Sequence, residues 1–312
     1  MNIKQHHAIM FHHLHDGEKH PASQGSLSAT QLRKMIEWLS ERYNLLSASE
    51  FIRKSEDGSI DESDICLSFD DGLKCQIDIA APILKEMEIG AFFFVYSGIY
   101  GKNPNYLEIY RYFRTTQFKN IDLFYEDFFC IAEENYQLNL ERVIKNFEQE
   151  QYLLGKNYLS RNDRIFRFIR DKCVPDIVYS EIMKIQMARR NFSPAKIINN
   201  LWMSEEDIRN LGSEGHVVGL HSYNHPTNIG NLDYDQQYQE YALNSKHLCR
   251  LVNTRPYVMA HPCGRYSAYT LKILTDMGIT MGFRSDMLDV IDRSNLEIPR
   301  RNHAEILAKI TE

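Results

Sequence analysis

The stretch Ile-Cys-Leu-Ser-Phe-Asp-Asp-Gly, residues 65–72, decides the fold. It joins a continuous apolar run to two adjacent carboxylates and a glycine. Residues 77–88 then show helical spacing, and the apolar run Ala-Phe-Phe-Phe-Val follows at 91–95. A buried strand, a helix and a second buried strand form the βαβ unit of a parallel sheet. The sequence therefore predicts the α/β fold class.

The same alternation occupies both ends of the chain. A strand is expected at 8–11, and Ser28-Ala29-Thr30-Gln31 has the form of a capping box that begins a helix. After the middle of the chain we expect helices at 205–211, 234–252 and 270–277, and strands at 217–220, 257–260 and 280–283. One α/β barrel commonly takes roughly 200 to 250 residues, so we predict a single domain over 1–312.

A middle segment, about 102–202, interrupts this domain as a mainly helical insertion. Helical segments are expected at 121–133, 140–152 and 177–190. The aromatic side chains of Phe124, Phe128 and Phe129 recur at helical spacing, which is typical of a core and also suits a platform for stacking sugars.

Two pairs of polar residues follow apolar runs and indicate chemistry. Asp70 and Asp71 end the first run, and His221 and His225 follow the short run 217–220. Since active groups of parallel α/β folds lie at strand carboxyl ends, the pairs can meet. One carboxylate and two imidazoles are ligands of catalytic metal sites, and the second carboxylate can act as general base. Each pair alone also fits a polar turn or a chance spacing.

The elements Phe69-Asp70-Asp71-Gly72 and His221-Ser222-x-x-His225, in this order, resemble the first two motifs of NodB-type polysaccharide deacetylases, carbohydrate esterase family 4. The resemblance implies a distorted (β/α) barrel. It also implies that Asp70 is the general base and that Asp71, His221 and His225 hold one divalent metal ion. Zinc is the first expectation, and cobalt or manganese also suit this ligand set.

A third segment, Ala260-His261-Pro262-Cys263-Gly264-Arg265-Tyr266, resembles the loop whose main-chain amide polarises the acyl oxygen in this family. Cys263 would supply that amide. The family commonly places an arginine near the base where this chain has Ala260, so Arg265, or Arg300 with Arg301, could supply the charge. Surface arginines are the alternative.

A histidine after a late strand protonates the leaving amine in this family. His303 is the candidate here because it is the only histidine after His261, and Asp286 and Asp289 could orient it. His12 resembles a histidine that closes the first strand of family members, although an exposed loop histidine is equally compatible. We expect His12, Arg265 and Arg300 to contact substrate.

Composition and charge narrow the function class. The 312 residues are 43% hydrophobic and 25% charged, with a formal charge of −6, which argues against nucleic acid as a partner. Six cysteines without paired spacing predict reduced thiols. No apolar leader and no apolar stretch of about eighteen residues is present, so we expect a cytoplasmic protein without an integral membrane segment.

The sequence-based hypothesis is a metal-dependent hydrolase that removes an N-acetyl or similar small acyl group from an amino sugar. A cytoplasmic location favours a nucleotide- or lipid-linked intermediate of surface polysaccharide biosynthesis as substrate. Two alternatives stay open: an O-deacetylase or other carbon–nitrogen hydrolase on the same metal centre, and a non-catalytic glycan-binding protein. The oligomeric state is not indicated.

Overall fold

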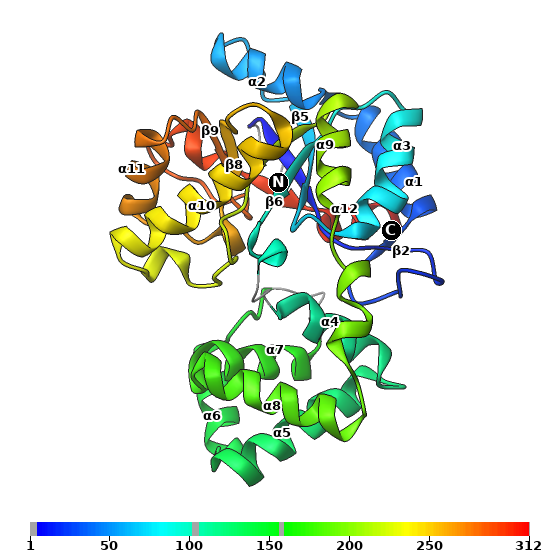
Figure 1. Cartoon of the computed structure of the whole chain (residues 1–312), viewed down its shortest axis with the longest axis vertical. Helices are drawn as coiled ribbons and strands as arrows, with labels where there is room; N and C mark the ends of the chain where they lie inside the picture. The colour runs from blue at the N-terminus through cyan, green and yellow to red at the C-terminus, as the bar shows by residue number, and fades with distance from the viewer. Residues whose placement is uncertain (1–4, 102–105, 156–158, 312) are drawn as a thin grey trace. The chain divides into compact units, whose positions relative to one another are not determined.

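The computed structural model describes residues 5–101, 106–155 and 159–311. The chain divides into two compact units (Figure 1). Unit 1 combines Met1–Asn105 with Asn200–Glu312, and unit 2 is Tyr106–Asn199. That unit 2 is an insertion into a single domain, at about 102–202, stays a prediction.

Unit 1 is built on a sheet in which every pair of neighbouring strands runs parallel. Its order is β10-β1-β5-β6-β7-β8-β9, with β4 paired to β5. A bridge from Phe283 to Ile298 nearly closes the sheet into a barrel, which confirms the predicted NodB-type barrel. The strands are β1 (His7–Phe11), β4 (Asn44–Leu45), β5 (Asp64–Asp70), β6 (Phe92–Val95), β7 (Val217–Leu220), β8 (Val258–Ala260), β9 (Met281–Phe283) and β10 (Arg300–Asn302), and β2 (Leu14–His15) pairs separately with β3 (Leu27–Ser28).

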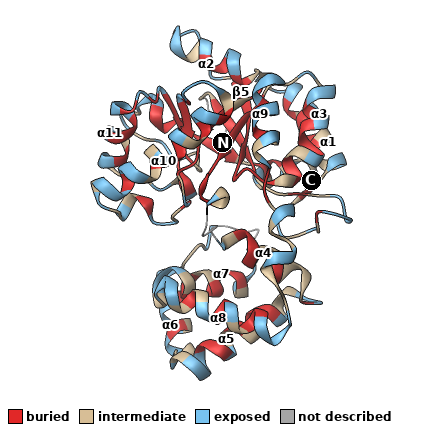
Figure 2. Ribbon diagram, viewed as in Figure 1, coloured by how far each residue is buried: buried red, intermediate tan, exposed pale blue. Residues whose placement is uncertain are grey.

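Helices surround this sheet and expose their outer faces, while the strands are buried (Figure 2). The predicted capping box is present, since the Ser28 hydroxyl accepts the Gln31 N–H at 3.2 Å and the Gln31 side chain accepts the Ser28 N–H at 2.9 Å. The expected helix at 77–88 begins instead as a π-helix, Gln76–Ala80. The α-helices of unit 1 are α1 (Ala29–Ser40), α2 (Ala48–Glu56), α3 (Ala81–Glu86), α9 (Glu205–Ser213), α10 (Tyr234–Val252), α11 (Ala268–Asp276) and α12 (His303–Thr311).

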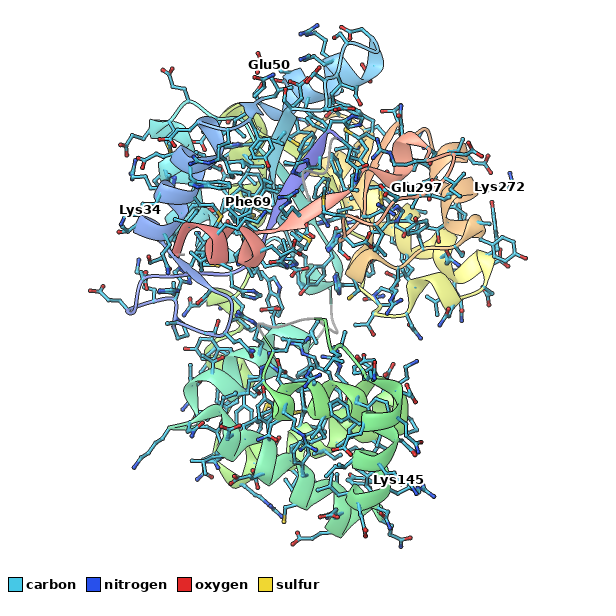
Figure 3. The ribbon with its side chains drawn as sticks, turned by 180° about the vertical axis from the view of Figure 1, so that it is seen from behind. Lys34, Glu50, Phe69, Lys145, Lys272 and Glu297 are labelled. Atoms are coloured by element: carbon cyan, nitrogen blue, oxygen red, sulfur yellow. The ribbon has the colours of Figure 1, made fainter. Side chains whose placement is uncertain are left out.

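Side chains alternate along each strand between the barrel interior and the helices. The interior cluster includes Cys66, Phe94, Ala260 and Phe283, and α2 packs against it through Phe51. Residues of the other parity, such as Phe69, are equally buried. Figure 3 shows Phe69 inside unit 1 and the exposed side chains of Lys34, Glu50 and Lys272 on its surface. This parity decides which strand-end residues can face the barrel axis.

Unit 2 consists of helices around an aromatic core. Phe124 and Phe128 are fully buried and pack on Phe166 at centroid distances of 5.2 and 4.9 Å, whereas Phe129 is half-buried. Phe124 and Phe128 are therefore core residues and form no exposed stacking platform. The helices are α4 (Leu107–Thr116), α5 (Ile121–Tyr136), α6 (Leu140–Glu150), α7 (Arg161–Phe168) and α8 (Asp176–Arg189).

Within the described ranges, no helix combines the length and the apolar character needed to cross a bilayer.

Candidate metal and catalytic site

The candidate site lies at the carboxyl ends of neighbouring strands of unit 1. Asp70 is the last residue of β5 and Asp71 follows it, while His221 directly follows β7. β6 alone separates these two strands in the sheet. Parallel pairing therefore brings together residues that are about 150 positions apart in the chain, as the alternation of strands and helices leads one to expect.

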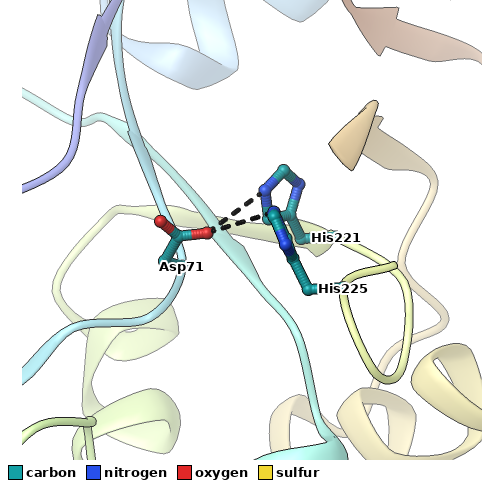
Figure 4. A group of neighbouring side chains, drawn as sticks. All are labelled: Asp71, His221 and His225. Carbon is teal, nitrogen blue, oxygen red and sulfur yellow. Dashed lines mark ion pairs between the residues drawn. The ribbon is translucent and has the colours of Figure 1, made fainter. Parts of the chain in front are cut away.

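Asp71, His221 and His225 form a compact ligand set (Figure 4). Their potential ligand atoms all lie within 4.8 Å of one another. Asp71 Oδ1 is 3.4 Å from His221 Nε2 and 3.5 Å from His225 Nε2. All three residues are buried. Within the described ranges this is the only cluster of this kind.

The donor set fits a divalent metal ion. Asp71 Oδ1 is buried without a hydrogen bond from any described residue, a costly arrangement that a cation would relieve. His221 Nδ1 donates to the Ala260 carbonyl at 2.9 Å, which leaves Nε2 as a lone-pair donor toward Asp71. One oxygen and two imidazole nitrogens form a three-ligand set of the catalytic type.

Electrostatics at these ligands favour a cation. Burial opposes ionisation of Asp71, but His221, His225 and His12 outweigh it and hold the pKa of this carboxyl well below its usual value. Burial likewise opposes protonation of His221, but Asp70 and Asp71 raise the pKa of this imidazole above its usual value. A metal ion must therefore compete with protons for Nε2 of His221.

The loop that carries the two histidines is shaped by its backbone. Ser222 and His225 have φ of 62° and 53°, and Asp71 has φ of 76°. Such left-handed residues are uncommon outside glycine, asparagine and aspartate and gather at functional sites. The histidine pair lies in a loop without regular structure and not on a helix.

Helix α10 holds this loop with polar side chains that the sequence analysis did not single out. Asn244 accepts the His221 N–H at 2.9 Å and donates to the Val95 carbonyl at 3.0 Å. Glu240 accepts the N–H groups of Tyr223 and Asn224 at 3.0 and 2.7 Å. Residues 240 and 244 lie one turn apart on the same helix face. Two polar residues at this spacing, on the helix that follows the His-x-x-x-His segment, were the sequence signal for a helix face that holds the loop.

Asp70 is held by a buried arginine from β10, the edge strand that β1 alone separates from β5. Arg300 Nη1 and Nη2 donate to the two carboxylate oxygens of Asp70 at 2.6 and 2.7 Å. Arg300 Nε donates to the Arg284 carbonyl at 2.6 Å. Burial opposes ionisation of Asp70, but Arg300 and His221 hold the pKa of this carboxyl below its usual value. Asp70 is therefore an ionised carboxylate beside the ligand set.

Of the three arginines proposed to supply this charge, the structure selects Arg300. Its guanidinium lies 5.6 Å from the Phe94 ring in the barrel interior, and Ala260 belongs to the same buried cluster as Phe94. Arg301, the next residue of β10, faces the other side of the strand. Arg265 is exposed. Because all three nitrogens of Arg300 donate within the protein and its side chain is 0% exposed, the expectation that Arg300 binds substrate needs correction: Arg300 lies behind Asp70.

His12 lies close to the carboxylates of both Asp70 and Asp71 and is partly exposed. Its Nε2 is 3.8 Å from Asp70 Oδ2 and 3.9 Å from Asp71 Oδ2, and 29% of its side chain is exposed. Gln76, which the sequence analysis missed, donates to the carbonyls of His12 and Asp70 at 2.9 and 2.6 Å. The buried amide of Gln76 thus ties the first strand end to β5.

His303 does not have the surroundings expected of the catalytic acid. Its Nδ1 and Nε2 face the carbonyls of Met10 and Gly25 at 3.1 and 2.8 Å. Of the two residues expected to orient it, Asp286 lies 3.6 Å from Arg284 and Asp289 is exposed. Both ring nitrogens thus lie against main-chain carbonyls, although a neutral imidazole can donate from only one of them. These contacts place the ring at the start of α12.

The Cys263 loop begins where β8 ends. Ala260, the last residue of β8, receives the hydrogen bond from His221, so this loop leaves the sheet beside the ligand set. Cys263 is exposed and has φ of 52°. The role of its amide as an oxyanion donor stays a prediction.

Comparisons with known proteins agree with this geometry. The family model described as polysaccharide deacetylase matches residues 184–282, which include His221 and His225. No curated protein matches the sequence at a significant level. Among solved structures, the deacetylase PplD of Streptococcus pyogenes, solved with acetate, is 15% identical with a TM-score of 0.55, covering 95% of this chain and 90% of its own.

Two further structures agree in fold. IcaB from Ammonifex degensii has 15% identity and a TM-score of 0.55, with 95% and 91% of the two chains covered. A de-N-acetylase from Aggregatibacter actinomycetemcomitans has 15% identity and a TM-score of 0.56, with 95% and 93% covered. The resemblance to NodB-type polysaccharide deacetylases is confirmed. The predicted enzyme class, a deacetylase, is confirmed as well.

Proposed function

We propose that this NodB-type protein is a metal-dependent deacetylase that removes an N-acetyl group from an amino sugar. One observation carries the proposal: an ionised carboxylate, Asp70, lies beside a three-residue metal ligand set that is buried at the carboxyl ends of the strands. A glycan-binding protein needs neither the ligand set nor a base. Zinc is the metal we expect, with cobalt or manganese as alternatives.

Asp71, His221 and His225 would hold the ion. When bound, a divalent ion acts as a Lewis acid and lowers the pKa of water toward about 7. Asp70 is proposed to take the proton from the attacking water. Its Oδ2 lies 4.0 Å from His221 Nε2, next to the ligand set, which supports this role. Arg300 keeps Asp70 ionised and fixed in orientation.

His12 is proposed to contact the acyl group or a neighbouring sugar hydroxyl. It faces both carboxylates and is more exposed than either of them. The Cys263 amide is proposed to donate to the oxygen that becomes negative during attack. His303 is not proposed as the acid that protonates the leaving nitrogen, because both of its ring nitrogens face main-chain carbonyls.

The substrate is proposed to be a nucleotide- or lipid-linked acetylated amino sugar of surface polysaccharide biosynthesis. This step rests on the cytoplasmic location expected from the sequence. The names of the similar structures, two of which refer to deacetylases, support the acyl chemistry. They do not identify the sugar or its carrier.

The test measures metal and product on the same protein. Wild type is expected to bind close to one zinc ion per chain and to release acetate and a free amine from an N-acetylated sugar. Asp70→Asn should retain the metal and lose turnover, whereas Asp71→Asn should lose both. Acetate released without a free amine would replace the proposal by O-deacetylation. A wild type that binds no divalent metal would contradict the proposal.

A further inference from the structure

A short segment of unit 1 pairs with the loop that carries Asp71. The Lys74 N–H donates to the Leu201 carbonyl and the Met203 N–H donates to the Gly72 carbonyl, both at 2.9 Å. Leu73 and Trp202 thereby form an antiparallel bridge. The chain turns away from β5 with positive φ at Asp71 and Gly72. The hydrogen bonds of Lys74 and Met203 attach this turn to residues 201–203.

The side chain of Trp202 reaches toward the other ligand loop. Its indole Nε1–H donates to the Tyr96 hydroxyl at 2.7 Å, and the two rings meet edge to face at 6.4 Å. The Tyr96 ring packs on the His225 ring at a centroid distance of 5.4 Å. Trp202 and Tyr96 are 6% and 2% exposed, so the contact series Trp202–Tyr96–His225 is buried.

We propose that Trp202 and Tyr96 form a clamp that positions two of the metal ligands together. The clamp acts on Asp71 through the main chain of 72–74 and on His225 through the Tyr96 ring. Trp202 is a positioning residue in this proposal, since neither it nor Tyr96 supplies a ligand atom. The inference rests on the proposed function, because it takes Asp71, His221 and His225 as the ligand set.

Two physical features favour positioning over simple core packing. His225 has a left-handed backbone and lies in a loop without regular structure, where the rings of Tyr96 and His221 pack against its imidazole. The Trp202–Tyr96 hydrogen bond joins two buried side chains, and such a bond sets a geometry that an apolar pair would leave free. Residues that orient ligands in this way typically change metal affinity by about 10- to 100-fold when they are altered.

The test uses the fact that the chain has two tryptophans, Trp38 and Trp202. Trp202→Phe removes the indole donor and Tyr96→Phe removes its acceptor, and both keep a ring. Each is expected to weaken zinc binding on the order of ten-fold, and the loss in the double variant should be smaller than the sum of the two single losses because both single variants lose the same hydrogen bond. Trp38→Phe is the matched control, since Trp38 stacks on Arg42 at 4.4 Å on α1.

A second readout follows Trp202 directly. In Trp38→Phe the remaining indole is Trp202, and zinc should change its fluorescence as His225 becomes fixed. In Trp202→Phe the remaining indole is Trp38, and its emission should stay constant. Ile36→Ala, which shortens a buried side chain of α1, lowers stability away from the clamp and should leave zinc affinity unchanged.

The outcomes separate the clamp from the proposed function. Wild-type zinc affinity in both ring variants, or Trp202 emission that ignores zinc bound by the same sample, would overturn the clamp and leave the deacetylase proposal intact. An equal loss of affinity in Ile36→Ala would also overturn it, because stability alone would then explain the effect. A wild type without zinc binding would overturn both proposals.

Discussion

Arg300→Met is expected to leave the Asp70 carboxylate buried without its cation and to cause a pH-dependent loss of stability. Arg300 donates to both oxygens of Asp70, at 2.6 and 2.7 Å. The side chains of the two residues are 0% and 3% exposed, so water can replace little of the lost interaction. Removing one partner of a buried ion pair typically costs about 3 to 5 kcal/mol.

The shift in pKa follows from the same contacts. Each hydrogen bond from Arg300 stabilises the ionised form of Asp70 and contributes about 1.5 to 3 kcal/mol as a hydrogen bond to a charged group. Loss of both bonds therefore raises the pKa of Asp70 in the folded state.

The sign of the pH dependence is set by the direction of each shift. In the wild type the folded-state pKa of Asp70 lies below its unfolded value, so its stabilisation is present above the unfolded pKa and is lost as the pH falls through the folded pKa. In Arg300→Met the folded pKa is raised, and acidification neutralises the stranded charge. The difference in unfolding free energy between the two proteins should be largest near neutral pH and shrink as the pH falls.

Denaturant unfolding at several pH values between acidic and neutral measures this difference. Arg301→Met is the matched control, because it removes the neighbouring arginine of β10 and leaves the Asp70 pair intact. Combining Asp70→Asn with Arg300→Met should abolish most of the pH dependence. A stability loss in Arg300→Met that stays constant with pH would refute the assignment of Arg300 as the cation that keeps Asp70 ionised.

Three further predictions concern the ligand loops. Gly98→Ala should weaken metal binding, because its Cβ would lie 2.6 Å from Asn224 Oδ1 and 2.8 Å from the Tyr223 carbonyl oxygen. Gly212→Ala is the control, since no atom lies within 4 Å of its Cβ, and it should leave metal binding unchanged. Equal zinc affinities of the two variants would contradict this prediction. Asn244→Ala should cost about 1 to 3 kcal/mol of unfolding free energy, since it strands buried polar groups, and an unchanged denaturant midpoint would contradict it. His225→Ala should abolish stoichiometric zinc in elemental analysis, while His247→Ala, on α10, should retain it.

Much of the barrel was accessible from the sequence because strong local signals agree with the tertiary structure. The apolar runs at β5 and β6 and the polar residues that follow β5 and β7 combine periodicity with position at strand ends. Asp70, Asp71, His221 and His225 could be brought together on this basis. Element boundaries differed by a few residues, as at the π-helix that precedes α3.

Other parts of the site carry no local signal. β10 contains Arg300, Arg301 and Asn302, a polar run that does not read as a buried strand. It pairs with β1 and its arginine meets a carboxylate of β5 on the other side of β1, a contact between positions 230 residues apart that no local pattern shows. His303 was predicted to be the acid only because it is the last histidine of the chain. In the structure its ring lies at the start of α12, against the carbonyls of Met10 and Gly25.

Ala260 and Arg300 together explain how a barrel without an arginine at position 260 still supplies a buried cation to Asp70. The two residues come from β8 and β10, and both side chains belong to the interior around Phe94. Position 260, at the end of β8, carries only a methyl group, and the guanidinium comes instead from β10, an edge strand of the nearly closed sheet. What the base requires is a buried cation within hydrogen-bond distance of both its oxygens, and the closed sheet lets more than one strand supply it. An apparently damaged motif is therefore poor evidence for lost activity until the barrel interior has been searched for the missing charge.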